Sequence, residues 1–167
     1  MVGVASERLS EMLASVSSTY TDIMTSVFSS AIAAKAWFAT AAGVLALVQV
    51  TTAARIFGKL QRLIPLQRPW PNRIHRWSGR LAFLCTLPVA FHCIFILGFQ
   101  TGNARVLAHS IFGTFVYGVF AVKVFFVRDH DHPRWTLPLV GGALFTVLAV
   151  LWSTSSLWYF TNVRFGF

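Results

Sequence analysis

Two histidines lie within long apolar stretches of the chain, where an ionisable side chain is costly unless it has a partner or a function. His92 lies near the end of the run 76–99, and His109 lies near the start of the run 104–127. Two antiparallel helices with a short connection place both imidazoles at a similar depth. Facing imidazoles can supply both axial ligands of a haem iron. We therefore expect haem at this pair; the alternative is that each imidazole bonds a backbone carbonyl between helices.

A glycine follows two of the histidines by one helical turn. Gly79 comes four residues after His75, and Gly113 comes four residues after His109, so each pair lies on nearly one face of its helix. The missing side chain lets a flat macrocycle approach closely, and it equally lets a neighbouring helix do so. Both glycines are therefore candidates for lining a cofactor site.

A second polar site is expected at the other end of these helices. His75 is about 25 Å from His92 along the helix axis and cannot serve the same haem. A second haem there would need His130 or His132 as its other ligand. Lys123 lies on nearly the same face as His109, and a buried lysine requires an anion, unless it extends to the membrane surface. We expect Lys123 and His75 to share a haem propionate, a quinone or a lipid headgroup.

The cysteines restrict the type of haem. The chain has no CxxCH sequence, which is the attachment site of covalently bound haem, so non-covalent haem b is expected, with one haem and a second only if His75 is a ligand. Cys85 and Cys93 are eight residues apart on one expected helix and cannot form a disulfide with each other.

The composition is that of an integral membrane protein. Hydrophobic residues make up 56% of the chain, charged residues 11%, and the mean hydropathy is +0.64. The 14 basic residues against 5 acidic ones could suggest nucleic-acid binding. They flank apolar runs instead of forming a soluble basic face, so we interpret them as topology signals and expect no nucleic-acid partner.

The apolar runs predict an all-α protein with four transmembrane helices, at about 36–54, 76–99, 104–127 and 136–160. Helices satisfy their own backbone groups in lipid, so these spans should form one four-helix bundle over residues 35–167. Residues 1–34 carry apolar side chains at intervals of three and four. They predict an amphipathic helix that lies on the membrane or on a partner, or else packs over the bundle.

Seven basic residues and no acidic residue lie between Arg55 and Arg80. By the positive-inside rule this connection is cytoplasmic, which places the 1–34 segment and both termini on the outer side. We expect a bacterial plasma membrane, with an organelle inner membrane as the alternative.

The stretches HRWSGRLAF and AHSIFGTFVYGVF, together with the single His92, resemble the haem-bearing helices of cytochrome b561-like and ferric-reductase-like membrane proteins. Residues 34–160, including AKAWFATAAGVLALVQV and SLWYF, are similar to small bacterial four-helix proteins of b561 type. The resemblance implies b-haem between helices and electron exchange with a quinone or a partner redox protein, and it supports His75, His92 and His109 as ligands. Lys123 does not fit this resemblance, because diheme b561 proteins have a haem ligand at the matching position.

These observations predict a membrane b-type cytochrome that carries electrons within or across the bilayer. Two imidazole ligands leave no open coordination position, which favours electron transfer over substrate activation. We expect an electron-transfer protein or a subunit of an oxidoreductase complex rather than a stand-alone enzyme. The alternative is a haem-free structural or adaptor subunit of a respiratory or photosynthetic complex. A transporter is disfavoured, because no inverted repeat is visible in the sequence.

Overall fold

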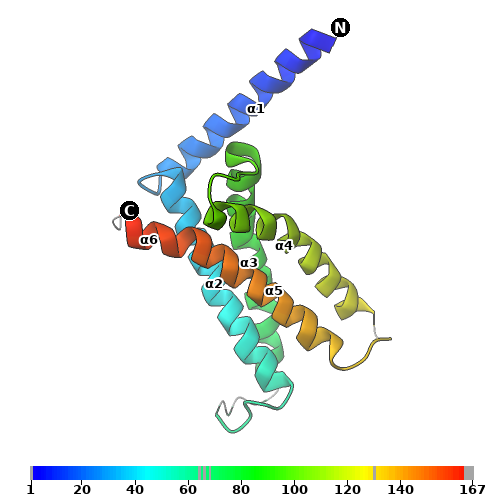
Figure 1. Ribbon diagram of the computed structural model, residues 1–167. Coiled ribbons are helices and arrows are strands. Elements are labelled where there is room, and N and C mark those ends of the chain that lie inside the picture. The colour runs from blue at the N-terminus through cyan, green and yellow to red at the C-terminus, as the bar shows by residue number, and fades with distance from the viewer. Residues whose placement is uncertain (1, 64, 66, 68, 130, 164–167) are drawn as a thin grey trace.

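Every secondary-structure element described in the computed structural model is a helix (Figure 1). The structure describes residues 2–63, 65, 67, 69–129 and 131–163. The elements in chain order are α1 (Val2–Thr25), α2 (Ala31–Ile56), α3 (Trp70–Phe91), η1 (His92–Leu97), α4 (Ala104–Arg128), α5 (Thr136–Trp152), η2 (Ser153–Leu157) and α6 (Trp158–Asn162), where η marks a π-helical segment.

Four of the described helices are long and apolar enough to cross a membrane, which confirms the predicted number of spans. They are Ala31–Ile56, Trp70–Leu97, Ala104–Arg128 and Thr136–Asn162. The first of these four helices, α2, begins at Ala31, earlier than the predicted span at 36. The Ser30 side chain caps α2 by accepting a hydrogen bond from the Ala33 backbone N–H. The second begins at Trp70, with Pro71 in its first turn, so His75 lies within the helix.

α2 is the central helix of the bundle and packs against both α3 and α5, whereas α4 packs mainly against α5. Its inward face consists of small side chains, which allow neighbouring helices to approach closely. The buried residues of this face include Ala33, Ala34, Ala36, Ala42 and Ala46. Large apolar side chains point outward instead, among them Leu84 and Phe115, each more than half exposed, as expected of a surface that faces lipid.

Side-chain contacts fix the antiparallel register of α3 and α4. The Tyr117 hydroxyl lies 3.2 Å from the Thr86 carbonyl oxygen, and the rings of Phe83 and Phe120 stack at 4.7 Å between centroids. Continuing this register by one turn places Lys123 at the level of Arg80. The two helices therefore touch through these side chains, while each packs more extensively against another helix, α3 against α2 and α4 against α5.

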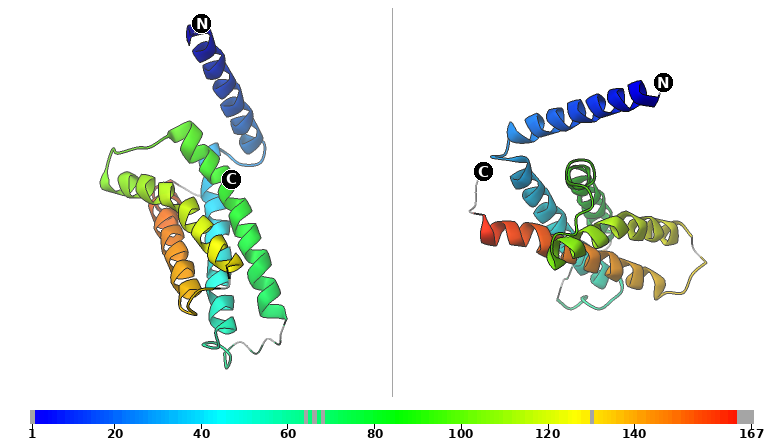
Figure 2. Two further views of the ribbon diagram at one scale, coloured as in Figure 1. Left: turned by 90° about the vertical axis from the view of Figure 1, so that its right-hand side faces the viewer. Right: turned by 45° about the horizontal axis from the view of Figure 1, so that its top comes forward.

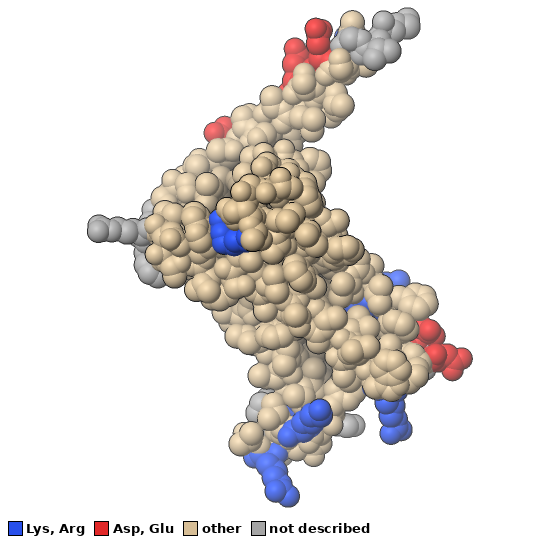
Figure 3. Space-filling model, viewed as in Figure 1, with Lys and Arg blue, Asp and Glu red and all other residues tan. Residues whose placement is uncertain are grey.

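The charges are distributed unequally between the two ends of the molecule. Lysine and arginine side chains gather at the end formed by the α2–α3 and α4–α5 connections, and acidic side chains lie on α1 and beside the α4–α5 connection (Figure 3). We call this the basic end, and the end that carries the α3–α4 connection the opposite end. The chain thus has the charge asymmetry that the predicted topology requires.

α1 projects from the bundle at the opposite end (Figure 2). Tyr20, near its C-terminus, packs its ring against Phe91 and His92, with centroid distances of 4.9 and 5.8 Å, and its hydroxyl donates to the Pro88 carbonyl at 3.1 Å. Further toward the N-terminus, apolar side chains such as Leu9 and Met12 are about half exposed. That α1 lies on a membrane surface stays a prediction.

Two π-helical segments occur at the opposite end among the described residues, one at the end of the second span and one in the fourth span. η1 begins at His92, whose backbone N–H bonds the carbonyls of both Pro88 and Val89. η2 continues α5 and contains Thr154. π-turns are rare and are frequent at functional sites. Neither segment was predicted, and both adjoin the candidate ligands described next.

Candidate functional site

His109 is held by a threonine from the neighbouring span. Its Nδ1 lies 3.0 Å from Thr154 Oγ1, and the Thr154 hydroxyl donates its proton to the Val150 carbonyl at 2.7 Å. Because that proton is committed to the backbone, Thr154 accepts and His109 Nδ1 carries the hydrogen. The lone pair of His109 is therefore on Nε2, which lies 3.8 Å from the Cys93 Sγ. This is the arrangement in which a histidine commonly binds a metal.

His109 and Cys93 both line a cavity of about 420 Å³ between α2, α3, α4 and α5. A volume of this size is typical of a site for a small molecule or a cofactor. The wall is mostly apolar, and several of its residues are small: Ala39, Ala42, Gly43, Ala90, Gly113 and Ser155. The predicted cofactor glycine Gly113 thus belongs to the cavity wall. The cavity extends from the α3–α4 connection, at Phe99, to Tyr117 in the middle of α4.

His92 is buried, with 4% of its surface exposed, and neither of its ring nitrogens has a hydrogen-bond partner among the described residues. The structure places it at the level of His109, because the next residue, Cys93, contacts His109. The two imidazoles nevertheless have different neighbours. His92 packs against Tyr20 of α1 and is not among the residues that line the cavity. Burial raises the pKa of the Tyr20 hydroxyl, so it remains a hydrogen-bond donor near neutral pH.

His75 is held in the same way as His109, but at the basic end. Its Nδ1 lies 3.0 Å from Thr52 Oγ1, and the Thr52 hydroxyl donates to the Val48 carbonyl at 2.6 Å. The same reasoning places the hydrogen of His75 on Nδ1 and its lone pair on Nε2. Thr52 comes from α2, the helix that precedes His75 in the chain.

The two histidine sites repeat one local arrangement in inverted orientation, which the sequence did not reveal. The threonine comes from the preceding helix in one site and from the following helix in the other, so the order of the helices along the chain is not repeated. His75 and His109 are each the sixth residue of their helix, counted from Trp70 and Ala104. The residue three positions before each threonine faces the glycine that follows the histidine, and these residues are Gln49 opposite Gly79 and Leu151 opposite Gly113. Because the two helices run in opposite directions, the arrangements lie at opposite ends of the bundle.

The two histidine sites differ in how much space lies beside the glycine. A Cβ on Gly79 would lie 3.2 Å from the Gln49 amide, which bonds both the His75 carbonyl and the Ser78 hydroxyl. A Cβ on Gly113 would meet only Leu151, at 3.9 Å, and this glycine borders the cavity. The Gln49 side chain therefore fills the position at the basic end that remains open at the opposite end.

The remaining predicted residues lie near the basic end. Lys123 is close enough to His75 for its charge to act on that imidazole. His132 packs its ring against Phe126, with 5.6 Å between centroids, and not against His75. His130, the other partner considered for a second haem, lies outside the described residues.

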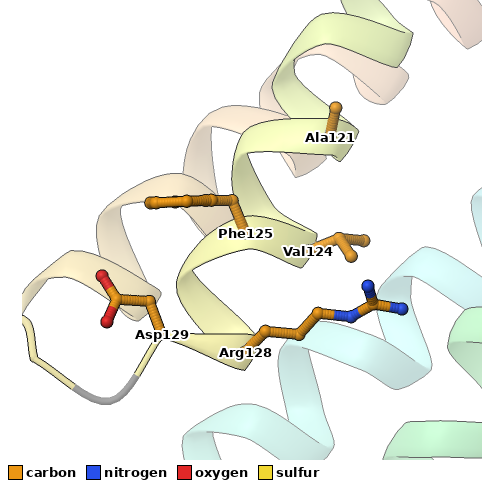
Figure 4. A pocket seen from close by; sticks show the side chains of 5 residues that line it. All are labelled: Ala121, Val124, Phe125, Arg128 and Asp129. Atoms are coloured by element: carbon orange, nitrogen blue, oxygen red, sulfur yellow. The ribbon is translucent and has the colours of Figure 1, made fainter.

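A shallow hollow occurs on the surface of α4 close to this end (Figure 4). The side chains that line it are those of Ala121, Val124, Phe125, Arg128 and Asp129. Arg128 and Asp129 point away from each other (Figure 4), and the Asp129 carboxylate accepts a hydrogen bond from the Asp131 backbone N–H at 3.1 Å. The hollow is open to the surroundings and does not include His75 or Lys123.

Several residues at the opposite end were missed by reasoning from the sequence. Thr154 fixes His109, Tyr20 covers His92, and the charge of Lys35 acts on His92, Cys93 and His109. A polar residue one or two turns from the end of an apolar span is the signal that could have found Lys35 and Thr154. The signal is weak, because most such threonines simply bond their own backbone.

No group of three or more histidine, cysteine, aspartate or glutamate side chains that could hold a metal ion occurs in the described part of the chain. No curated protein and no solved structure matches the chain. Over residues 2–167 it matches a family of unknown function, and the chain therefore belongs to that family, DUF6529.

Proposed function

We propose that this chain is an integral membrane b-type cytochrome, with haem bound non-covalently between α3 and α4 at the opposite end. The observation that carries the proposal is the arrangement of His109. Thr154 fixes the hydrogen on Nδ1, which leaves the Nε2 lone pair beside a cavity of about 420 Å³. A haem ligand needs this tautomer, and a second-shell hydrogen bond of this kind both orients the ring and raises its basicity.

The second ligand in this proposal is His92. Its two ring nitrogens are buried without a partner among the described residues, which is costly for any polar group. An iron atom would satisfy one of them. His92 lies against Tyr20 rather than in the cavity wall, so its binding requires the side chain to turn toward the position of Cys93. His109 is therefore the principal ligand.

The protein would contribute burial, orientation and charge, and the bound haem would supply the one-electron chemistry. Small residues such as Gly43, Ala90 and Gly113 leave room for a flat ligand in the cavity. Lys35 lies near both histidines, where an ammonium group could pair with a propionate.

We further propose that electrons are exchanged with a quinone or a partner redox protein, and that the chain lies in a bacterial plasma membrane with both termini outside. The basic α2–α3 connection supports this orientation. A haem b at the opposite end would then lie near the outer surface. The b561-type architecture expected from the sequence is part of this proposal.

The test is the absorption spectrum of the purified protein after expression with a haem precursor. We expect sharp b-type bands in the reduced-minus-oxidised spectrum, and about one haem per chain in a pyridine haemochrome assay. His109→Ala should lose most of the haem. His92→Ala should retain haem but convert low-spin bands to high-spin ones. His132→Ala, outside the apolar helices, is the matched control and should match the wild type.

A colourless preparation that is folded and monodisperse would refute the cytochrome assignment. Full haem occupancy in both His92→Ala and His109→Ala would refute the assignment of these histidines as ligands. The experiment thus tests separately whether the protein is a cytochrome and whether these residues hold the haem.

The second candidate function is a haem-free structural or adaptor subunit of a respiratory or photosynthetic complex. Two observations favour it: Thr154 and Cys93 already lie against both nitrogens of His109, and α1 carries exposed apolar side chains away from the bundle. A stable colourless protein that co-purifies with a larger complex only when α1 is present would support this function.

A further inference from the structure

Lys123 is an unpaired cation in an apolar helix. It is partly buried in α4, and no described residue forms a hydrogen bond or an ion pair with it. The five acidic residues of the chain lie elsewhere: Glu7, Glu11 and Asp22 are on α1, and Asp129 and Asp131 are in the α4–α5 connection. An unpaired charge in a low-dielectric environment is unfavourable, so this position favours an external anion.

The level of Lys123 in the bundle coincides with features of a membrane surface. The register of α3 and α4 places Lys123 at the level of Arg80, and Trp77 lies one turn nearer the basic end of α3. Trp70 and Trp77 are both more than half exposed, as are tryptophans of the interfacial belt. Arginines cover both rings, at 5.8 Å for Arg73 over Trp70 and 5.0 Å for Arg80 over Trp77. Lys123 therefore lies at the depth of lipid headgroups.

The surroundings select the kind of anion. Gln49 fills the space beside Gly79 and His75, and Lys123 does not line the cavity at the opposite end, so neither feature provides a haem site at Lys123. The outward faces of α3 and α4 instead carry exposed apolar side chains such as Leu84 and Val127. Acyl chains can lie along these side chains while a headgroup meets the cations.

We propose that Lys123, together with Arg80 at the same level of α3, binds the phosphate group of an anionic phospholipid at the basic end. Basic pockets between transmembrane helices on the cytoplasmic side are suited to acidic headgroups. The ammonium group supplies a compact charge and the guanidinium group a planar pair of donors for the phosphate oxygens. The site is independent of haem and does not rely on the proposed function.

The experiment measures lipid binding to the full chain in detergent by native mass spectrometry, with phosphatidylglycerol and phosphatidylcholine as probes. Wild-type protein should prefer phosphatidylglycerol. Lys123→Met should weaken phosphatidylglycerol binding roughly tenfold or more, the loss expected for a charge-assisted hydrogen bond, and Lys123→Arg should restore it. Lys59→Met removes the same charge from an exposed position in the α2–α3 connection and should have little effect.

Three results would overturn the proposal. Equal binding of the two lipids would show that no phosphate-specific charge recognition exists. Equal losses in Lys59→Met and Lys123→Met would mean that net charge, and not a site, attracts the lipid. Displacement of phosphatidylglycerol by millimolar inorganic phosphate would identify the ligand as free phosphate. Helical circular dichroism of each variant checks that the fold is intact, and Lys123→Arg keeps the test decisive if Lys123→Met misfolds.

Discussion

At the scale of single residues, the most informative groups are the hydroxyls that determine histidine tautomers. Thr52 and Thr154 donate to their own backbone and so must accept from His75 and His109. Both histidines consequently hold an Nε2 lone pair in a defined direction. His109 lines the cavity of about 420 Å³, and His75 does not.

Thr154→Val should weaken haem binding at His109 by roughly 10–100-fold, because it removes the second-shell acceptor while nearly conserving the volume. Without this acceptor His109 can adopt the other tautomer, with its lone pair away from the cavity. Haem content measured by titration of the apoprotein reports the change. Thr52→Val makes the same substitution in the other half of the repeat and should leave haem content unaltered. If the two variants bind haem equally, Thr154 does not position a ligand.

The sequence predicted the level of His92 and His109 correctly but not the direction in which each side chain points. Level follows from counting residues along antiparallel helices, which small irregularities barely change. Direction changes by about 100° per residue in a regular helix, and the π-helical segment that begins at His92 departs from that periodicity. Tyr20, which covers His92, comes from a helix about seventy residues earlier in the chain. No local pattern could reveal that contact.

At the scale of elements, the α2–α3 pair and the α4–α5 pair differ at the glycine that follows each histidine. Gln49 links α2 to the His75 carbonyl and the Ser78 hydroxyl, whereas its counterpart in the repeat, Leu151, makes only van der Waals contact. The hydropathy of each span predicted the four helices, because backbone groups in lipid must be satisfied within a helix. It did not predict their exact ends, which depend on Ser30 and Pro71.

Gly79→Ala should leave the protein less stable than Gly113→Ala by about 1–3 kcal/mol, the range for forcing an extra methyl group into a packed position. The new Cβ at residue 79 meets Gln49, which can move only by giving up its hydrogen bonds to α3. At residue 113 the new Cβ makes an ordinary contact. Alanine favours a helix more than glycine does, but both variants gain this stability equally, so it does not affect the difference between them.

Unfolding by sodium dodecyl sulfate in mixed micelles, followed by circular dichroism, measures this difference. Equal stability of the two variants would mean that Gln49 adapts freely and that the α2–α3 contact is not tightly packed.

At the scale of the whole molecule, the formal net charge of +9 is concentrated at one end of a bundle whose sides are apolar. By the positive-inside rule, this asymmetry predicts how the chain is oriented in a membrane. Two chemical environments are separated in the same way: His92 and the cavity lie at the opposite end and Lys123 near the basic end, and neither side chain has a hydrogen-bond partner in the part of the chain that the structure describes. The inverted repeat of histidine, threonine and glycine gives both ends the same framework, and Gln49 makes them different.

Both ends of the chain should therefore lie on the side of the membrane opposite the α2–α3 connection. Seven basic residues between Arg55 and Arg80 resist transfer across a membrane, and an even number of spans returns the C-terminus to the side on which the N-terminus lies. Alkaline phosphatase fused after Phe167, or inserted at Gly102 in the α3–α4 connection, should be active in the periplasm of a bacterial host.

Green fluorescent protein inserted at Gly58 should fluoresce in the cytoplasm. Replacing Lys59 and Arg62 by glutamine should reduce the fraction of molecules in this orientation without reversing it, because the other basic residues remain. A fluorescent, cytoplasmic fusion at Phe167 would mean that one of the four helices does not cross the membrane, and the outer position proposed for the His109 cavity would then be wrong.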